Sequence, residues 1–247
     1  MSGQRIMEER STAMLPLPVI LSGGLGTRLG PLAEGLPKPM VTVAGRPFLE
    51  HVVRQLAGQG FPEILLLVGY KAEIIESHFG DGAAFGLRVR YSREPEPSGT
   101  GGALKLAGPF IQDRFLMLYG DLYRDFDYMD FCTRHTCALA VYPYIPGLTT
   151  IACANVGLDL EGKRVARYAK GDPGARLTHV DAGFGIFGQE ALQLLPAGNT
   201  SFEEQVYPTL AASGKLDAEL VDRGFFDIGN PADLAHARTH FDSHPSH

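Results

Sequence analysis

Two cations and two carboxylates occupy positions in this sequence where they could handle a phosphorylated ligand. Arg28 closes a glycine-rich run, and Lys38 follows ten residues later between Pro37 and Pro39. Asp121 and Asp227 each follow an apolar stretch. Cations neutralise phosphate oxygens, and carboxylates hold the hard divalent ions that accompany phosphates. Whether these four residues meet depends on the elements that carry them.

The glycine-rich run directly follows a short apolar stretch. Val19 to Leu21 has the composition of a buried strand, and the residues after it, SGGLGTR, run from Ser22 to Arg28. Glycine lets the backbone approach a ligand closely and direct N–H groups at it. With Lys38 as a second cation, the run predicts a polyphosphate site. A tight bend without a ligand is the alternative for the loop alone.

Two well-known nucleotide-binding loops do not fit this run. The dinucleotide fingerprint needs G-x-G-x-x-G, but after Gly24 and Gly26 the next glycine, Gly30, comes one position late. The P-loop pattern fails because the run has no Gly-Lys-Ser/Thr ending. These mismatches disfavour a dinucleotide-dependent oxidoreductase.

The composition is that of a globular protein. The chain has 247 residues, of which 45% are hydrophobic and 20% charged, and this length is sufficient for one large domain. Its formal net charge of −6 argues against nucleic-acid binding, so an anion site must be a local cluster of cations. No apolar run approaches the roughly 20 residues that cross a membrane, which predicts no membrane partner.

The ends and the cysteines bear on domain limits and location. Residues 1–17 lack an apolar signal core and are interpreted as a flexible leader, and residues 242–247 as a flexible tail. The three cysteines have no zinc-like spacing. We expect Cys137 and Cys153 to be buried free thiols in a reducing, cytoplasmic environment.

Strand and helix patterns alternate through the first half, and the second half contains more strands. The repeated β-α order with very apolar strands predicts a mixed, mostly parallel central sheet between two helical layers, an α/β three-layer αβα domain over residues 18–241. The expected strands are 19–21, 64–68, 87–91, 115–119, 139–142, 151–156, 164–168 and 183–187. The expected helices are 48–56, 71–79, 100–107, 189–195, 202–212 and 231–241.

Ligands of such sheets bind at the carboxyl ends of the strands. The glycine-rich run, the turn Gly99–Gly102 and Asp121 all follow predicted strands. Two prolines hold the approach from Glu94 extended, and the glycines expose backbone groups that could read the edge of a nucleobase. The alternative is a plain helix start capped by Ser98 or Thr100.

The remaining polar positions have two interpretations each. Asp121 and Asp227 could be turn residues, but together they suggest a Mg²⁺ site completed by substrate phosphates and water. Lys170 could contact a phosphate or lie in solvent. Asp181, ahead of Gly183, could bind sugar hydroxyls or cap a turn. Glu203 could lie on a solvated helix face or over a sugar pocket.

The motifs together resemble the sugar-1-phosphate nucleotidyltransferases. Gly23–Leu29 with Pro37–Pro39 is similar to the signature of that family, and the similarity extends from Pro18 to Phe241. Later landmarks follow in order: Gly99–Gly102, Gly120–Asp121, Lys170, Asp181–Gly183 and Asp227–Pro231. Thr42–His51, Val68–Lys71 and the run from Glu94 resemble the guanylyltransferases for D-glycero-α-D-manno-heptose 1-phosphate. Ala169 and Asp181 depart from the family, which commonly has Glu and Asn there.

The resemblance implies a Rossmann-like, GT-A-like nucleotidyltransferase fold and a role for each candidate residue. Arg28, Lys38, Asp121 and Asp227 are the expected catalytic residues, with Mg²⁺ on the two aspartates. The expected nucleotide-binding residues are Ser22, Gly23, Gly24, Gly26, Thr27, Glu94, Gly99, Thr100 and Gly101. The expected sugar phosphate-binding residues are Lys170, Asp181, Gly183 and Glu203.

The implied reaction joins a sugar 1-phosphate to a nucleoside triphosphate, preferably GTP, and releases pyrophosphate. Its product would supply capsule, lipopolysaccharide or S-layer glycan synthesis. Mannose-1-phosphate guanylyltransferases and glucose-1-phosphate uridylyl-, thymidylyl- or cytidylyltransferases are the alternatives, followed by a non-catalytic regulatory member. The oligomeric state is left open, with a homodimer as the commonest arrangement.

Overall fold

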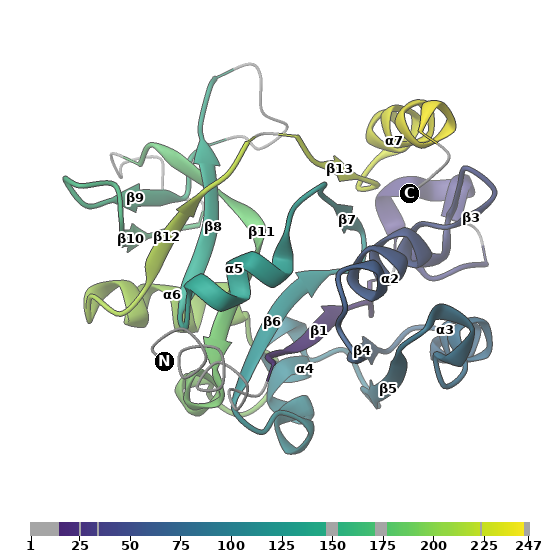
Figure 1. The fold of residues 1–247 in the computed structure, drawn as a ribbon, viewed down its shortest axis with the longest axis horizontal. Coiled ribbons are helices and arrows are strands. Elements are labelled where there is room, and N and C mark those ends of the chain that lie inside the picture. The colour runs from purple at the N-terminus through teal and green to yellow at the C-terminus, as the bar shows by residue number, and fades with distance from the viewer. Residues whose placement is uncertain are drawn as a thin grey trace, which may run out of the picture.

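Nine of the strands in the described residues form one central sheet (Figure 1). The computed structural model describes residues 15–24, 26–33, 35–146, 153–170, 177–222 and 224–244. The sheet order is β10-β9-β11-β6-β1-β4-β5, with β8 paired to β11 and β12 to β8. The strands are β1 Leu17–Leu21, β4 Glu63–Val68, β5 Arg88–Arg93, β6 Arg114–Tyr119, β8 Ala138–Pro143, β9 Val156–Leu158, β10 Val165–Tyr168, β11 His179–Gly188 and β12 Asp217–Leu220.

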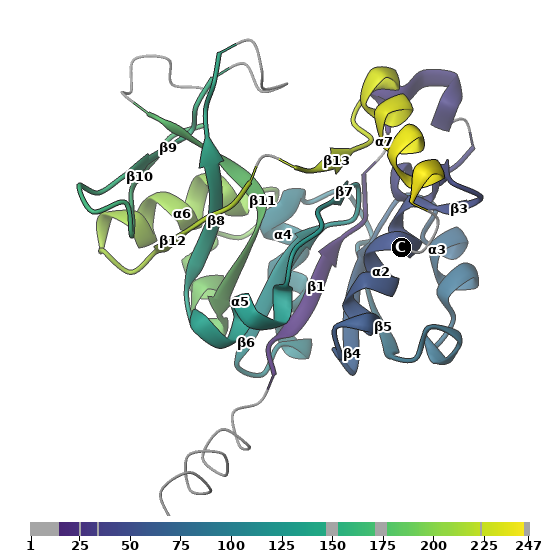
Figure 2. The same ribbon diagram turned by 45° about the horizontal axis from the view of Figure 1, so that its top comes forward.

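Helices cover both faces of this sheet, which confirms the three-layer prediction. On one face lie α2 Phe48–Gly58, α3 Ala72–Phe79, α5 Tyr128–Arg134 and α7 Pro231–Ser243. On the other lie α4 Gly99–Ala107, α6 Phe202–Ala212 and the 3-10 helix η5 Gln189–Leu194, and Figure 2 shows α4 and α6 on one side of the strands. Successive strand residues alternate between the layers: Ile20 packs with the first set and Val19 with the second.

The strand directions bring the predicted loops to one edge. β1 is parallel to both β4 and β6, and β4 is parallel to β5, so these four strands end at the same edge. β11 runs antiparallel to β6 and to β8, which makes the sheet mixed, as expected. The glycine-rich run, the approach from Glu94 and Asp121 therefore converge on one crevice.

Short elements complete the edge. β7 Leu122–Tyr123 pairs antiparallel with β13 Phe226–Asp227, and β2 Thr42–Val43 with β3 Arg46–Pro47. The β7–β13 ladder brings the last quarter of the chain beside the end of β6. The short 3-10 helices are η1 Thr27–Ala33, η2 Lys38–Met40, η3 Ala83–Phe85 and η4 Gly108–Phe110.

Several predicted elements differ from the structure. The strand predicted at 151–156 is wrong for residues 153–155, because β9 is Val156–Leu158 and shares only Val156 with it; residues 151 and 152 lie outside the described residues. The helix predicted at 189–195 is present as a 3-10 helix over residues 189–194. The sequence did not predict α5 and β12, since both are short. Cys137 and Cys153 are half-buried rather than buried, although all three thiols are free.

The predicted domain limits fall close to the ends of the outermost elements. β1 begins at Leu17, one residue inside the predicted leader, and α7 continues to Ser243, two residues into the predicted tail. Residues 1–14 and 245–247 lie outside the described residues. Among the described helices, none combines the length and apolarity needed to cross a membrane.

Gly120, at the end of β6, provides a test of this packing. A Cβ atom there would lie 2.7 Å from Ser22 Oγ and 3.2 Å from Leu21 O, atoms of the neighbouring strand end. We expect Gly120→Ala to lower the free energy of unfolding by about 1–3 kcal/mol through overpacking, measured by urea denaturation. Gly58→Ala is the control, because a Cβ at Gly58 meets nothing within 4 Å. Equal stability of Gly120→Ala and the wild type would contradict this packing.

Candidate active site

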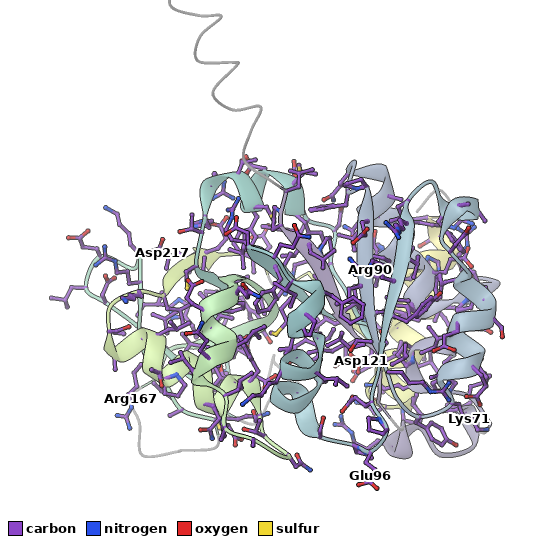
Figure 3. All side chains as sticks on the ribbon, turned by 90° about the horizontal axis from the view of Figure 1, so that it is seen from below. Lys71, Arg90, Glu96, Asp121, Arg167 and Asp217 are labelled. Carbon is purple, nitrogen blue, oxygen red and sulfur yellow. The ribbon has the colours of Figure 1, made fainter. Side chains whose placement is uncertain are left out.

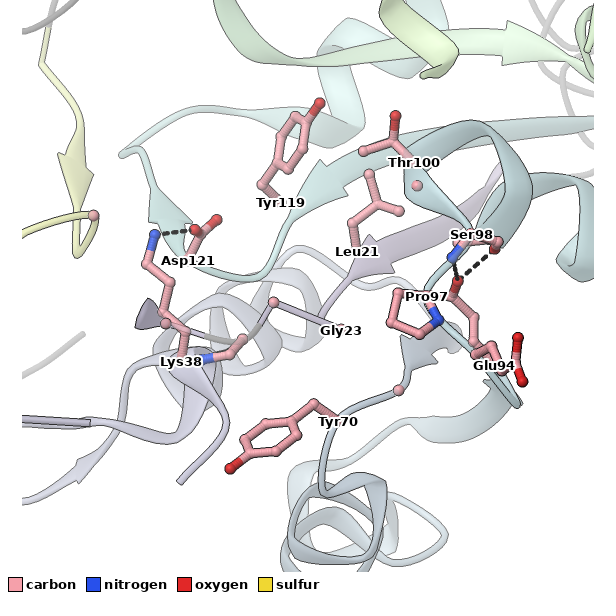
Figure 4. Close-up of a pocket in the computed structure, with 18 of the residues that line it drawn as sticks. Leu21, Gly23, Lys38, Tyr70, Glu94, Pro97, Ser98, Thr100, Tyr119 and Asp121 are labelled. Atoms are coloured by element: carbon pink, nitrogen blue, oxygen red, sulfur yellow. Dashed lines mark hydrogen bonds and ion pairs between the residues drawn. The ribbon is translucent and has the colours of Figure 1, made fainter. Parts of the chain in front are cut away.

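Two adjoining cavities open at the carboxyl ends of the strands. The larger, of about 620 Å³, is lined by the ends of β1, β4, β5 and β6 (Figure 4). The smaller, of about 190 Å³, is lined by residues of β6, β7, β8, β10, β11, α6 and β13 and of the loops beside them. Tyr119, at the end of β6, lines both. In Figure 3, Asp121 lies in the interior of the view and Glu96 at its edge.

The glycine-rich run forms one wall of the larger cavity. Gly23, Gly24, Gly26 and Arg28 line it, as predicted. Gly26 has a φ of 67°, and a Cβ atom on it would lie 3.1 Å from Lys38 Cβ, so glycine allows the loop to pack against Lys38. Ser22 does not line the cavity, since it is buried and its N–H donates to Leu67 O at 2.9 Å. The Thr27 side chain lies outside the described residues.

Lys38 and Asp121 meet at one end of the larger cavity. The Nζ atom of Lys38 forms an ion pair with Oδ2 of Asp121 (Figure 4). The lysine side chain is 10% exposed and the aspartate 30%, so both are partly desolvated but still reach the cavity. The backbone N–H of Lys38 also donates to Gly24 O at 3.3 Å. Two sequence motifs predicted separately thus form one cluster.

Asp227 reaches the same place through the short β7–β13 ladder. It lies opposite Leu122, the neighbour of Asp121, and the Ile228 N–H donates to Asp121 O at 3.2 Å. Burial raises the pKa of Asp227, and the negative charges of Asp233 and Asp121 act in the same direction. The Gly229 N–H and the Lys38 charge oppose this rise in pKa. Two negative side chains and one positive side chain thus act on the Asp227 carboxylate.

These two carboxylates fit a magnesium ion. Mg²⁺ typically takes one or two carboxylates, together with substrate phosphates and water. Among the described residues, no cluster of three or more His, Cys, Asp or Glu side chains forms an all-protein metal cage. The raised pKa of Asp227 beside Asp121 is what a bound cation would reverse.

Glu94 and the turn after it form the opposite end of the larger cavity. Oε2 of Glu94 accepts from the Ser98 N–H at 3.0 Å and from Ser98 Oγ at 2.5 Å, which fixes the carboxylate. Oε1 lies 3.3 Å from where a Cβ on Gly23 would be, so it borders the glycine-rich wall. Gly99 and Thr100 line the cavity. Gly101 lies outside its lining, and its N–H donates to Thr200 O at 2.8 Å.

All four residues predicted to bind the sugar phosphate line the smaller cavity: Lys170, Asp181, Gly183 and Glu203. The sequence did not predict that Tyr119, Tyr142, Asn155 and Tyr168 join them. Tyr119 ends the predicted strand 115–119, immediately before Gly120–Asp121. Because ligands bind at the carboxyl ends of such strands, the sequence could have identified it. Tyr168 ends the predicted strand 164–168, so the same rule could have identified it, whereas Asn155 lies inside the predicted strand 151–156 and belongs to no motif.

Asp181 has an unusual environment in the smaller cavity. Pairing between β11 and β8 shifts register after Asp181, and Oδ1 of Asp181 accepts from the Gly183 N–H at 2.8 Å. Burial raises the pKa of Asp181 to about 7, and the negative charge of Glu203 contributes, while the Gly183 N–H and Lys170 oppose the rise. Asp181 therefore titrates near neutral pH.

Glu203 is the second acid of this cavity, and unlike the half-buried Asp181 it is fully buried. Although its burial opposes ionisation, hydrogen bonds from Ser201, Tyr119 and Thr100 hold its pKa below the usual value. Glu203 also lies in the first turn of α6, where the helix dipole favours an anion. Glu203 is therefore ionised where Asp181 is partly protonated.

The sequence model of the nucleotidyl transferase family matches residues 17–144. A mannose-1-phosphate guanylyltransferase from Mycobacterium tuberculosis is 34% identical over 226 residues, covering 87% of this chain. The chain spans 62% of the length of that relative. A D-glycero-alpha-D-manno-heptose 1-phosphate guanylyltransferase from Campylobacter jejuni is 33% identical over 223 residues, covering 88% of this chain and 96% of the relative.

A solved structure has the same fold. HddC from Yersinia pseudotuberculosis is 30% identical, with a TM-score of 0.76, and the match covers 92% of this chain and 100% of HddC. A second structure of HddC, complexed with GMP-PN, has a TM-score of 0.75 at 29% identity.

The pKa of Asp181 predicts a pH-dependent stability. Because this pKa is raised, the folded state binds more protons than the unfolded chain between about pH 4 and 7, so stability falls as pH rises through that range. Asp181→Asn removes the buried charge and should stabilise the protein by more than about 1 kcal/mol at pH 8, with little effect at pH 4.

Thermal denaturation at pH 4, 6 and 8 measures this effect. Asp113→Asn is the control, since that side chain is 62% exposed and should show no such pH trend. A difference between Asp181→Asn and wild type that is the same at all three pH values would refute the assignment.

Proposed function

The chain belongs to the nucleotidyl transferase family, and we propose that it transfers the guanylyl group of GTP to a sugar 1-phosphate. The products would be a GDP-sugar and pyrophosphate. One observation carries the proposal: the two cavities adjoin at Tyr119, with Lys38 and Asp121 in the larger and Asp227 and Lys170 in the smaller. The paired carboxylates thus lie where a nucleotide in one cavity would meet a phosphate in the other.

The chemistry requires positioning and charge neutralisation. An oxygen of the sugar phosphate attacks the α-phosphorus of GTP; a new P–O bond forms, and the bond to the pyrophosphate oxygen breaks. The attacking oxygen is already anionic, so the step needs no general base. The barrier comes from repulsion between anions and from charge on the phosphates, so catalysis depends on orientation and electrostatics.

Residues of the larger cavity would hold the triphosphate. The glycine-rich N–H groups and Arg28 line the wall, and Lys38 lies beside Asp121. Lys38 would exchange its ion pair with Asp121 for a phosphate oxygen when GTP binds. Mg²⁺ held by Asp121 and Asp227 would neutralise charge on the phosphate oxygens.

Glu94 supports the choice of guanine. Its Oε2 accepts both hydrogen bonds from Ser98, which leaves Oε1 as an acceptor next to Gly23. Guanine presents two neighbouring donors, N1–H and N2–H, whereas adenine presents an acceptor at N1. The complex of the related HddC with GMP-PN is consistent with a guanine nucleotide.

The smaller cavity would hold the sugar phosphate. Lys170 would pair with the phosphate, and Asp181 and Glu203 would accept from sugar hydroxyls. D-glycero-α-D-manno-heptose 1-phosphate is our first candidate, supported by the Campylobacter relative and by the motifs Thr42–His51 and Val68–Lys71. Mannose 1-phosphate is the second, supported by the Mycobacterium relative. The wider proposal is a cytoplasmic, Mg²⁺-dependent and dimeric enzyme of capsule, lipopolysaccharide or S-layer glycan synthesis.

A screen of pyrophosphate release tests the function. Four nucleoside triphosphates are combined with heptose, mannose and glucose 1-phosphates in the presence of Mg²⁺. We expect release with GTP and a manno-configured sugar phosphate. No release with any pair would favour a regulatory protein that binds nucleotide sugars without turnover.

Removal of one charged group where the two cavities meet should strongly slow turnover. We expect Asp121→Ala or Arg28→Ala to lower kcat of the folded protein by 10² or more, by loss of one electrostatic stabiliser (an effect of about 3 kcal/mol), with folding checked by melting temperature. The controls are Asp125→Ala and Arg88→Ala, which change exposed residues of the same charge. Wild-type pyrophosphate release by either site variant would contradict its assignment.

Glu94→Gln tests base recognition. Glutamine carries no negative charge, so its amide oxygen accepts more weakly from the guanine N–H groups. The KM for GTP should therefore rise about tenfold. The wild-type preference for GTP over ITP, which lacks the 2-amino group, should shrink. Glu161→Gln is the control, because that side chain is 72% exposed and lines neither cavity. An unchanged ratio of GTP to ITP activity in Glu94→Gln would contradict this role.

A further inference from the structure

Glu203 is a buried carboxylate surrounded by hydroxyl groups. It is 3% exposed. Thr100 Oγ donates to its Oε2 at 2.7 Å, Ser201 Oγ donates to the same oxygen at 2.5 Å, and the Tyr119 hydroxyl donates to Oε1. Three side chains from three different segments therefore fix the orientation of this carboxylate.

A count of acceptor positions shows what remains for a ligand. Each carboxylate oxygen can accept about two hydrogen bonds. Among the described side chains, Thr100 and Ser201 donate to Oε2 and Tyr119 alone donates to Oε1, while the Glu203 backbone N–H also bonds the carboxylate. Because Glu203 lines the smaller cavity and Oε1 has fewer side-chain donors than Oε2, Oε1 is the oxygen that a sugar hydroxyl would approach.

Both hydrogen bonds of the Thr100 hydroxyl go to residues of α6 and not to the larger cavity. Its O–H donates to Glu203, and the same oxygen accepts from the Phe202 N–H at 2.9 Å. The sequence placed Thr100 among the nucleotide-binding residues, and its side chain does line the larger cavity. The Thr100 O–H group, however, points to the Glu203 carboxylate of the smaller cavity.

Backbone hydrogen bonds also connect the segment that contains Thr100 to the segment that precedes Glu203. Gly101 N donates to Thr200 O at 2.8 Å, and Thr200 N donates to Ser98 O at 2.9 Å. A Cβ on Gly101 would lie 2.6 Å from Thr200 Cγ2, so the start of α4 fits closely against the approach to α6. The start of α4 and residues 200–203 thus form a hydrogen-bonded seam between the two cavities.

We propose that Thr100 is a positioning residue for the sugar half of the site: its hydroxyl fixes Glu203 so that Oε1 can accept from a sugar hydroxyl. Tyr119 would act on the same carboxylate from the other side. The inference rests on the proposed function only in naming a sugar phosphate as the ligand. It predicts that loss of the Thr100 hydroxyl weakens sugar binding and leaves nucleotide binding unchanged.

Steady-state kinetics of three variants separate the two roles. Thr100→Val keeps the shape and removes the hydroxyl; Thr100→Ser restores it; Thr209→Val removes a hydroxyl that bonds Gln205 O on the exposed side of α6. With GTP and mannose 1-phosphate or heptose 1-phosphate, we expect Thr100→Val to raise the KM for the sugar phosphate about tenfold. The KM for GTP should stay within twofold, and Thr100→Ser and Thr209→Val should resemble wild type.

Either of two results would overturn the inference. One is a rise confined to the KM for GTP, or equal for both substrates. The other is failure of Thr100→Ser to restore the KM for the sugar phosphate. Melting temperatures of all variants identify any that fail to fold. If Thr100→Val is one of them, Thr100→Ala, which also lacks the hydroxyl, replaces it in both measurements.

Carbon-13 NMR titration of the Glu203 carboxyl, assigned by comparison with Glu203→Gln, needs no turnover. Loss of the Thr100 hydroxyl removes a donor to the ionised form, so Thr100→Ser should titrate as wild type and Thr100→Val at higher pH. If wild type shows neither turnover nor binding of the sugar phosphates, the proposed function fails, yet this shift would still support the role of Thr100. An unchanged titration in Thr100→Val overturns it.

Discussion

The ion pair between Lys38 and Asp121 is the interaction on which the site depends. It joins the segment after the glycine-rich run to the end of β6, and both partners are partly removed from water. The chain carries two carboxylates, Asp121 and Asp227, in a crevice for which we propose two anionic substrates, and Asp227 has a raised pKa. Such a site is stable only if cations accompany the negative charges. Lys38 supplies one in the structure, and Mg²⁺ with Arg28 would supply the others when the triphosphate arrives.

The fold places these charges by strand direction. Parallel strands β1, β4, β5 and β6 end at one edge and build the larger cavity, whereas the antiparallel β11 and the returning β13 build the smaller. Tyr119 stands at the boundary and touches both. The seam formed by Thr100 and Glu203 closes that boundary from the side of α4 and α6. The proposed nucleotide and sugar parts of the site are therefore connected by direct hydrogen bonds.

Much of this arrangement could be predicted from the sequence, because motifs that follow parallel strands must lie together at one edge of the sheet. The three-layer fold, the lining of the larger cavity by Arg28 and Lys38, and the grouping of the four predicted sugar-phosphate residues around the smaller cavity follow from such motifs. What escaped prediction depends on tertiary contacts between distant segments. Ser22 is buried beneath Gly120, Gly101 is paired with Thr200, and the Thr100 hydroxyl is held by Glu203, 103 residues away. A glycine-rich turn indicates that backbone groups are exposed, but it does not indicate on which side they find partners.

The central claim is that the two cavities bring a sugar phosphate oxygen to the α-phosphorus of GTP. Incubation of the wild-type protein with Mg²⁺, the sugar 1-phosphate and GTP labelled with ³²P in either the α- or the γ-position tests it most directly. The account predicts that the α-label appears in the nucleotide sugar and the γ-label entirely in pyrophosphate. Appearance of the γ-label in inorganic phosphate or in a phosphorylated sugar would contradict it, because the attack would then have occurred at a different phosphorus atom.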